Sequence, residues 1–335
     1  MTAVSYQCGP RVVTVVADPR VRDGIDHYLR AQRRPLCPPD TTVTVRVDPP
    51  EVPHRRNEAH TGHQLGERTA FTGDIYQAFL TDRITLVPSS PGHVVDLGDN
   101  TITVHAANTG IGIRIAVRVL RQITMRAAED AGARALHAGA VVVDGRAVLV
   151  GGRAGAGKTT MLLQLIKLGA APMASDRTMV TSENTHLHGT AVPHAWRITP
   201  QGLESATELH QIWQCPQRGQ RLADGKAELT PVEIADAYDR PLHSASPVSA
   251  LVLVDRTILA PAISHSAGLR PHLDFGNDDP FAEDWLTQRR TATRTTADSP
   301  WWNQLTTDLP TLRIRWTHPQ ELALAAAAAD TWIRQ

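Results

Sequence analysis

The sequence predicts an α/β fold in which a phosphate-loop domain with a mixed sheet follows a β-rich N-terminal domain. Residues 152–159 read Gly-Arg-Ala-Gly-Ala-Gly-Lys-Thr and match the pattern G-x-x-x-x-G-K-[ST]. Two β-branched runs joined by Asp144-Gly145 lead into this loop. Further β-branched runs, separated by turn clusters, dominate the first 108 residues.

Residues 1–108 are expected to form the N-terminal domain, for which the sequence discloses no role. The expected strands cover residues 12–16, 41–47, 84–87 and 101–105. One short helix is expected over residues 21–32. A polar segment with His60 and His63 follows three prolines. It is expected to be a solvated loop and not a metal site, because the histidines lack an acid or cysteine partner at ligand spacing.

The second domain, residues 109–335, is expected to begin with an amphipathic helix over residues 112–133. Apolar residues recur there at helical spacing, as at Ile113, Val117 and Leu120. The arginines between them are expected on the solvated side of the helix and not on a nucleic-acid face.

Residues 136–152 are expected to form a β-hairpin. Asp144-Gly145 is a strong signal for a two-residue hairpin turn between two apolar strands. The strand that enters the phosphate loop should therefore run antiparallel to its predecessor. This arrangement is unusual, because in the commonest phosphate-loop enzymes that strand opens a βαβ unit.

The loop at residues 152–159 has the context that its motif requires, with an apolar strand before it and a buried helix, residues 160–168, after it. Its glycines let backbone N–H groups turn toward phosphates, and the helix adds the positive end of its dipole. Lys158 is expected to reach the β- and γ-phosphates, and the Thr159 hydroxyl to coordinate Mg²⁺. The expected nucleotide-binding residues are Gly152, Gly155, Ala156, Gly157, Lys158, Thr159 and Thr160. ATP and Mg²⁺ are the expected cofactors.

Two acids follow expected strands and compete for a role beside the loop. Asp176 comes after residues 170–174, and Asp255 comes after residues 250–254. An acid at such a strand end can meet Mg²⁺ or a reacting hydroxyl. From the residues alone, each is equally an ordinary strand-end residue.

Other parts of the chain allow more than one interpretation. Lys226 is a candidate for contacting substrate or phosphate. Residues 288–296 are basic and without acids, which fits a phosphate- or peptide-binding loop or a plain solvated one. Five of the seven tryptophans follow residue 284, where core packing is expected and a binding platform is the alternative. A closing helix is expected over residues 321–334.

Composition narrows the class of protein. Lys plus Arg equal Asp plus Glu at 34 each, so no net field attracts nucleic acid or an anionic membrane. The three cysteines include no C-x-x-C pair, which fits a reducing compartment. The start of the chain lacks the pattern of a signal peptide, and the longest apolar run, residues 322–329, is too short to span a bilayer. A cytoplasmic protein is expected.

Residues 136–180 resemble the kinase domain of the HPr kinase/phosphorylase family and its relatives in peptide natural-product pathways. The matching features are Leu136-His137, the Asp144-Gly145 hairpin, the loop at residues 152–159, the helix end Lys167-Leu168-Gly169-Ala170, and Ala174-Ser175-Asp176-Arg177. The resemblance implies an α/β P-loop kinase domain of the HPr kinase type. It also implies that Asp176 is the catalytic acid or base and a metal ligand, and that His137 is a catalytic residue that supports it.

Two departures limit what this resemblance implies. The family usually has two successive acids, and here Ser175 stands where the first would be. Asp176 alone would therefore serve as the base and the metal ligand, two roles that two acids usually share. The E-I-R-G segment of true HPr kinases is absent downstream, so HPr is not the expected substrate and the reverse phosphorylase reaction is not assumed.

The expected function is an ATP- and Mg²⁺-dependent kinase that acts on a hydroxyl, namely a Ser or Thr side chain of a peptide or small protein. The most specific form of this expectation is that the acceptor is a precursor peptide of a natural-product pathway. The alternatives are a kinase for a small hydroxylated metabolite and a nucleotide-binding regulatory or interaction protein without transfer activity. No nucleic-acid or membrane partner is expected, and a homo-oligomer is compatible with the sequence.

Overall fold

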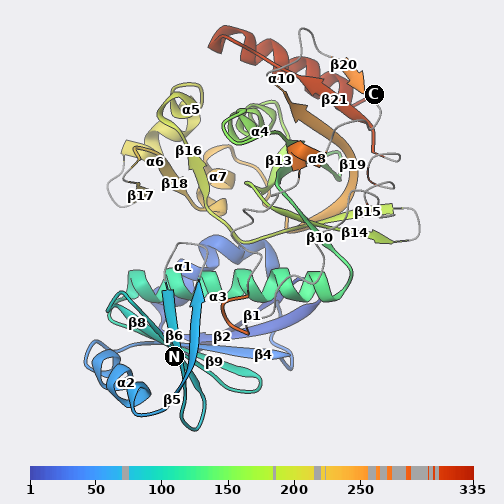
Figure 1. Ribbon diagram of the computed structural model, residues 1–335. Coiled ribbons are helices and arrows are strands. Elements are labelled where there is room, and N and C mark those ends of the chain that lie inside the picture. The colour runs from blue at the N-terminus through green and yellow to red at the C-terminus, as the bar shows by residue number, and fades with distance from the viewer. Residues whose placement is uncertain are drawn as a thin grey trace. The chain divides into compact units, whose positions relative to one another are not determined.

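The chain has a mixed α/β fold with several sheets (Figure 1). This computed structural model describes residues 1–69, 75–183, 186–214, 220–222, 224–255, 262–264, 270–273, 284–287, 301, 305 and 309–335. Contacts divide the chain into two compact units. Unit 1 comprises Met1–Asp130 and Asp278–Arg294, and unit 2 comprises Ala131–Asn277 and Thr295–Gln335. None of the helices among the described residues is long and apolar enough to cross a lipid bilayer.

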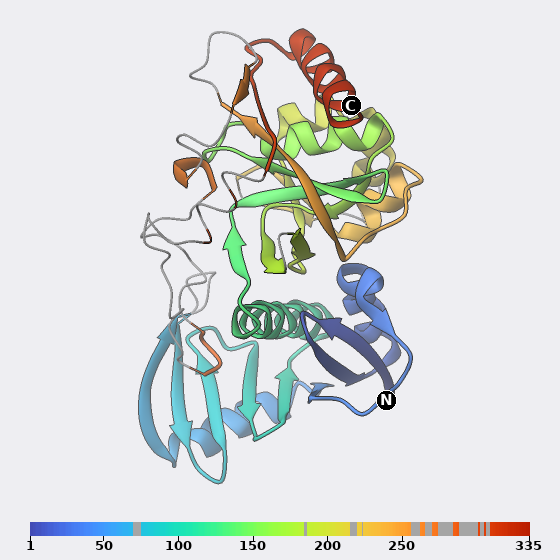
Figure 2. The ribbon, with the colours of Figure 1, turned by 90° about the vertical axis from the view of Figure 1, so that its right-hand side faces the viewer.

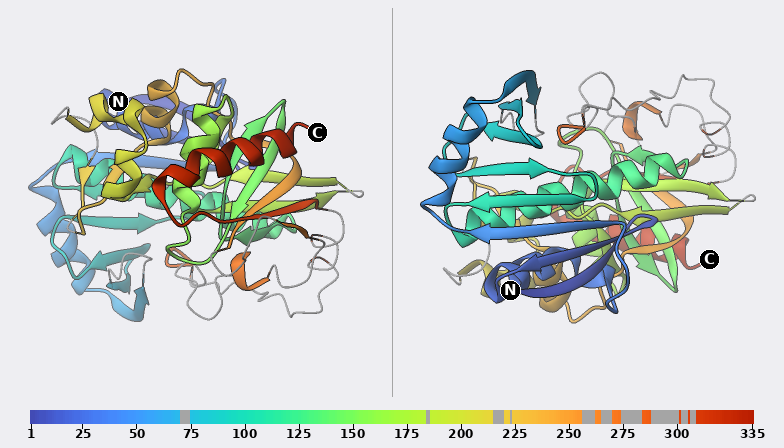
Figure 3. Two further views of the ribbon diagram at one scale, coloured as in Figure 1. Left: turned by 90° about the horizontal axis from the view of Figure 1, so that it is seen from above. Right: turned by 90° about the horizontal axis from the view of Figure 1, so that it is seen from below.

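Unit 1 is built on a nine-stranded mixed sheet with the order β3-β1-β2-β4-β9-β8-β7-β6-β5. Its strands are β1 (Thr2–Cys8), β2 (Arg11–Ala17), β3 (Arg33–Arg34), β4 (Thr41–Val47), β5 (His63–Thr69), β6 (Ile75–Leu80), β7 (Ile84–Pro88), β8 (His93–Leu97) and β9 (Thr101–Ala106). The pairs β2–β4 and β4–β9 are parallel, and the other pairs are antiparallel. The four runs predicted as strands lie in β2, β4, β7 and β9, and the right-hand view of Figure 3 shows the strands side by side.

Two helices, α1 (Pro19–Leu29) and α3 (Thr109–Asp130), cover one face of this sheet. Alternate residues of β2 and β4, such as Val13, Val15 and Val43, point into the core that these helices close. α3 buries Ile115 and Val119 in the same core, and Figure 1 shows it running across the sheet. The helix therefore packs as part of unit 1, and the expectation that it begins the second domain at residue 109 is wrong.

The opposite face of the sheet carries α2 (Glu51–His60). It buries Ala59 against Phe79 of β6 and Val87 of β7. The residues before them in these strands, Ala78 and Leu86, point to the core on the other face of the sheet. Glu51–His60 thus form a helix, so the expectation of a solvated loop is wrong. The helix tolerates Pro53 because this residue lies in the first turn, where backbone N–H groups have no partner within the helix.

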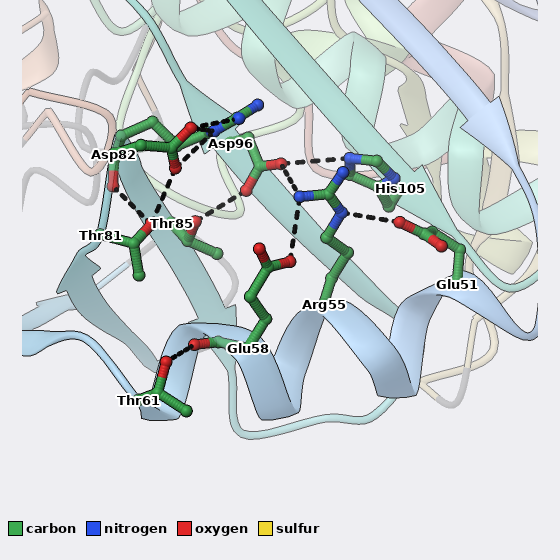
Figure 4. A network of polar contacts seen from close by, with 10 residues as sticks. Glu51, Arg55, Glu58, Thr61, Thr81, Asp82, Thr85, Asp96 and His105 are labelled. Carbon is green, nitrogen blue, oxygen red and sulfur yellow. Dashed lines mark hydrogen bonds and ion pairs between the residues drawn. The ribbon is translucent and has the colours of Figure 1, made fainter.

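A polar network also ties α2 to the sheet (Figure 4). Asp96 is its centre: its Oδ1 accepts from Thr85 Oγ1 at 2.8 Å, and its Oδ2 lies 3.2 Å from His105 Nε2. Arg55 Nη1 on the helix lies 4.0 Å from the same Oδ2. Arg55 also pairs along α2 with Glu51 at 2.7 Å and with Glu58 at 3.1 Å. We call these six residues the Asp96 network.

A segment from late in the chain completes the core of unit 1. The Trp285 ring stacks on Tyr76 with 5.0 Å between ring centroids, and Arg68 donates hydrogen bonds to the carbonyl groups of Trp285 and Leu286. Trp285 thus packs in the core of unit 1 and is not part of the C-terminal cap that the crowding of tryptophans suggested. The basic segment 288–296 lies outside the described residues.

Unit 2 is built on a second mixed sheet with the order β10-β14-β15-β19-β12-β11-β13, and β21 adds to it beside β19. Its strands are β10 (Arg134–Leu136), β11 (Ala138–Val143), β12 (Arg146–Gly151), β13 (Ala171–Ala174), β14 (Thr178–Glu183), β15 (His186–Ala191), β19 (Ala245–Val254), β20 (Ala262–Ser264) and β21 (Thr311–Ile314). A small separate sheet consists of β16 (Trp196–Ile198), β18 (Ala227–Leu229) and β17 (Gln220–Arg221). The helices are α4 (Lys158–Lys167), α5 (Pro200–Glu204), α6 (His210–Gln214), α7 (Pro231–Ala237), α8 (Arg270–Leu273) and α10 (Pro319–Ile333).

The central strands of this sheet are buried on both faces. On one face Val148, Val150 and Val252 pack against α4 and α10, which lie next to each other. On the other face Leu149 and Leu251 pack in a second cluster that includes Leu273 of α8. Figure 2 shows α4 and α10 on one side of these strands and α8 on the other. This continuous apolar character explains why the runs at β11, β12 and β19 show no alternation in the sequence.

Candidate functional site

The candidate site lies where β12 passes into α4, at the end of a β-hairpin. β11 pairs antiparallel with β12, and the turn residues Asp144 and Gly145 have φ values of +48° and +77°. Two successive positive φ values belong to the turn that matches the twist of paired strands. The sequence signal Asp144-Gly145 therefore corresponds to the local geometry, and β12 runs into the glycine loop, residues 152–157.

The shape of the glycine loop depends on two of its glycines. At Gly152, φ is +147° and an added Cβ would lie 2.6 Å from the Val254 carbonyl oxygen of β19. At Gly157, φ is +110° and an added Cβ would lie 2.6 Å from Cζ2 of Trp316. A side chain at either position would combine backbone strain with a clash. Gly157 is also the N-cap of α4, so the loop delivers the chain into the helix at this residue.

The remaining loop residues have distinct environments. Gly155 has a φ of +73°, and a Cβ there would meet nothing within 4 Å. Ala156 is buried, and its N–H donates to the Arg153 carbonyl at 3.0 Å, which closes a turn within the loop. Thr159 and Thr160, in the first turn of α4, are half-buried.

Lys158 is the first residue of α4, and its side chain folds back over the loop. Its Nζ donates to the Gly152 carbonyl at 3.0 Å and lies 3.0 Å from His137 Nε2. The side chain is 8% exposed. Burial lowers the pKa of Lys158, and the nearby carboxylate of Asp176 offsets part of that effect.

Strand pairing brings His137 and Asp176 to Lys158. His137 precedes β11, and Asp176 follows β13 by two residues. β11 pairs antiparallel with both β12 and β13, so its beginning lies beside the ends of both neighbours. His137 Nε2 consequently lies 3.2 Å from Asp176 Oδ1, and Lys158 Nζ lies 4.0 Å from the same oxygen. We call His137, Lys158 and Asp176 the site triad.

One nitrogen of His137 serves two neighbours that need opposite protonation. When Nε2 carries no proton, its lone pair accepts a hydrogen bond from the ammonium of Lys158. When Nε2 carries a proton, it donates to the carboxylate of Asp176. Moving Lys158 away from His137 would therefore favour the hydrogen bond to Asp176.

Asp176 is the exposed member of the triad, with 49% of its side chain accessible. Partial burial raises the pKa of Asp176, but the hydrogen bond from His137 and the electrostatic interactions with His137, Lys158 and His194 outweigh this effect. The net pKa lies below the usual range of an aspartate, so this carboxyl is ionised at neutral pH.

The side chain of Ser175, the residue before Asp176, is buried and bonds to the backbone. It is 4% exposed, and its Oγ donates to the Ala195 carbonyl at 3.2 Å. A carboxylate at position 175 in this orientation would be buried. The segment after β13 therefore offers the triad one carboxylate, that of Asp176.

Asp255, the competing acid, follows β19, the parallel neighbour of β12. Its side chain is 3% exposed, and Oδ2 accepts from Arg313 Nη1 at 3.2 Å. His272 Nε2 lies 3.9 Å from the same oxygen. Both acids thus stand at strand ends near the glycine loop, but Asp255 is buried in an ion pair whereas Asp176 is accessible.

Lys226 pairs with a neighbour in sequence and not with the triad. Its Nζ donates to Asp224 Oδ2 at 2.7 Å, just before β18 of the small sheet. The structure thus assigns this lysine a local ion pair.

The short helix α8, whose carbonyl groups support the site, was not predicted from the sequence. The Leu273 carbonyl accepts from the His137 N–H at 2.8 Å, and the His272 carbonyl accepts from the Gly152 N–H at 3.2 Å. These are backbone contacts, which any residue type could make, so no side-chain pattern could have revealed them. The contact of Trp316 with the glycine loop was not predicted either, because the sequence showed this residue only as one of the five tryptophans after residue 284.

Among the described residues, no group of three or more His, Cys, Asp or Glu side chains could enclose a metal ion. Mg²⁺ in phosphoryl-transfer enzymes needs only one or two protein oxygens, and phosphates and water supply the rest. The Thr159 hydroxyl and the accessible Asp176 carboxylate fit that requirement.

The sequence matches no protein-family model and no curated protein. Among solved structures, it is similar to the HPr(Ser) kinase/phosphatase from Coxiella burnetii, at 15% identity and a TM-score of 0.31. That match covers 60% of this chain and 94% of the other. The likeness to a kinase is a distant one, and at this TM-score it carries no weight for the function of this chain.

Proposed function

We propose that the protein is an ATP-dependent kinase that transfers the γ-phosphoryl group to a hydroxyl. The observation that carries the proposal is the meeting of the glycine loop with the site triad at one edge of the sheet. Phosphoryl transfer needs a phosphate cradle, a fixed cation and a group that orients the attacking hydroxyl, and these residues supply all three.

In this proposal the glycine loop and Lys158 hold the nucleotide. Backbone N–H groups of the loop and the N-terminus of α4 bind the phosphates. Lys158 exchanges its contacts with His137 and the Gly152 carbonyl, both at 3.0 Å, for the β- and γ-phosphates. Because the lysine is 8% exposed, its charge acts in a poorly solvated setting, where it stabilises phosphate charge strongly.

Asp176 orients the acceptor hydroxyl and takes its proton. Its lowered pKa keeps it ionised, which suits a group that accepts a hydrogen bond from the hydroxyl before transfer. Its 49% exposure leaves it accessible to an acceptor. Once Lys158 has moved to the phosphates, the Nε2–H group of His137 donates a hydrogen bond to Asp176 and holds the carboxylate in place.

The Thr159 hydroxyl and Asp176 would hold Mg²⁺ together with the nucleotide phosphates. When bound, the ion would neutralise charge on the β- and γ-phosphates and help align the phosphoryl group. The loop glycines and Lys158 bind phosphate independently of it.

We propose a Ser or Thr side chain of a peptide or small protein as the acceptor, with a precursor peptide of a natural-product pathway as the first to try. A small hydroxylated metabolite is the alternative acceptor within the same chemistry. A nucleotide-binding protein without transfer activity is the second candidate function, and the presence of Ser175 where a second acid would stand favours it.

The test is transfer from ATP labelled in its γ-phosphate, in the presence of Mg²⁺, to peptides encoded beside the gene and to a lysate of the host. Lys158→Ala is the control for phosphate binding. A labelled acceptor that appears with the wild type and not with Lys158→Ala supports the kinase. Tight ATP binding without a labelled acceptor favours the second candidate, and unchanged ATP affinity in Lys158→Ala contradicts the assignment of the loop.

A further inference from the structure

A tryptophan that the proposed mechanism does not use contacts the glycine loop. Trp316 lies two residues beyond the end of β21. β21 is parallel to β19, and β19 is parallel to β12. The carboxyl ends of these three strands therefore share one edge of the sheet, which is where nucleotides bind in α/β folds. The glycine loop, Asp255 and Trp316 follow the three strands at that edge.

The contact between Trp316 and the loop is close. A Cβ added to Gly157 would lie 2.6 Å from Cζ2, 3.0 Å from Cη2 and 3.7 Å from Cε2 of the indole. These atoms form one edge of the six-membered ring, so this edge of the indole meets the residue before Lys158. The contact requires glycine at position 157, in addition to the φ of +110°.

Trp316 is not fully buried in the core. It packs against the core cluster that includes Ile314 and Leu322, but it remains half-buried. A solvent-accessible indole costs hydrophobic stabilisation that complete burial would provide. A planar aromatic ligand could recover that stabilisation by stacking.

We propose that Trp316 is the stacking surface for the base of a purine nucleoside triphosphate whose phosphates occupy the glycine loop. The inference rests on the proposed function, because it needs a nucleotide at the loop. The competing explanation is that Trp316 is a wedge that only holds Gly157 in place. The two explanations differ in which part of the ligand depends on the indole for its binding. Stacking affects the base alone, whereas a wedge that shapes the loop affects the phosphates.

The experiment compares two ligands, ATP and inorganic triphosphate, by titration calorimetry with the full chain. Base stacking predicts that Trp316→Ala weakens ATP binding about tenfold and leaves triphosphate binding within about twofold. Trp316→Phe, which keeps a ring, should retain most of the ATP affinity. Trp332→Ala is the matched control, because Trp332 is also half-buried against the same core cluster but lies near the end of α10.

A wedge role gives a different result. If Trp316→Ala weakens ATP and triphosphate equally, or leaves ATP binding unchanged, the stacking proposal is overturned. If Trp316→Ala does not fold, Trp316→Leu fills the same space without a ring and is held to the same two outcomes. Lys158→Ala separates this test from the parent proposal. An unchanged affinity of Lys158→Ala for both ligands would refute phosphate binding at the loop, whatever the variants of Trp316 do.

Discussion

Two His–Asp pairs in this chain have the same separation and opposite surroundings. His105 Nε2 lies 3.2 Å from Asp96 Oδ2 in unit 1, and His137 Nε2 lies 3.2 Å from Asp176 Oδ1 in unit 2. In the first pair the side chains are 2% and 4% exposed, and in the second they are 22% and 49% exposed. The distance alone therefore does not separate a structural pair from a candidate catalytic pair.

The neighbours of the two pairs make the difference. Asp96 is surrounded by Thr85, His105 and Arg55 within unit 1, and these contacts fix α2 on the sheet (Figure 4). Asp176 lies beside Lys158 and the glycine loop, and half of its side chain is accessible. Burial and polar contacts suit the Asp96 network to stability, whereas accessibility and the neighbouring glycine loop suit the site triad to the proposed chemistry.

The largest expected effect is that of Asp176→Asn. The amide cannot accept the proton of the acceptor hydroxyl, so phosphoryl transfer should fall by about 10²–10⁴-fold. Because Asp176 is half-exposed, the free energy of unfolding should change by less than about 1 kcal/mol. Initial transfer rates and urea unfolding measure the two quantities. Full turnover in Asp176→Asn together with none in Asp255→Asn would assign the chemistry to the other acid.

Asp96→Asn should give the reverse pattern. Removing this buried charge leaves His105 and Arg55 with a weaker partner, and the free energy of unfolding should fall by about 2 kcal/mol. The transfer rate per folded molecule should stay the same. Urea unfolding of this variant, compared with Asp176→Asn, tests the contrast directly. A loss of transfer at unchanged stability would show that the Asp96 network is not merely structural.

The sequence revealed those parts of the site that local backbone geometry dictates. Asp144-Gly145 specifies a turn with two positive φ values, and Gly152 and Gly157 specify a loop that excludes side chains. Such signals need no knowledge of the tertiary structure. The strand, loop and helix around Lys158 were predictable for this reason.

Parts stabilised by distant residues were not predictable. α2 contains Pro53 and few apolar residues, and it is held on the sheet by the packing of Ala59 and by the approach of Arg55 to Asp96. Trp285 joins the core of unit 1 across more than two hundred residues of chain, through Tyr76. α8 supports His137 through a backbone carbonyl. Each of these depends on contacts that sequence periodicity does not encode.

A smaller effect is expected from His137→Gln, which separates positioning from proton abstraction. The glutamine can still donate to Asp176 but holds it less firmly, so kcat should fall about tenfold while the KM for ATP changes little. His105→Gln in the buried pair should lower stability and leave kcat unchanged. Steady-state kinetics of both variants provide the comparison. An equal loss of kcat in the two would remove the distinction between the pairs.

The smallest effect concerns the dependence of stability on pH. Burial raises the pKa of Asp96, but hydrogen bonds from His105 and Thr85 and the positive charges of His105 and Arg55 lower it to a net value below the usual range. A carboxyl whose pKa is lower in the folded state contributes stability that is fully present above its unfolded pKa of about 4. That contribution is lost as the pH falls through the folded pKa.

The difference in unfolding free energy between wild type and Asp96→Asn should therefore be constant from about pH 5 to pH 7 and shrink below about pH 4. Urea unfolding of both proteins between about pH 3 and pH 7 measures it. A difference that stays constant down to about pH 3 would mean that the charge of Asp96 contributes nothing and that its shape alone holds the network together. The buried pair would then differ from the site triad in kind, because only the triad would use its charge.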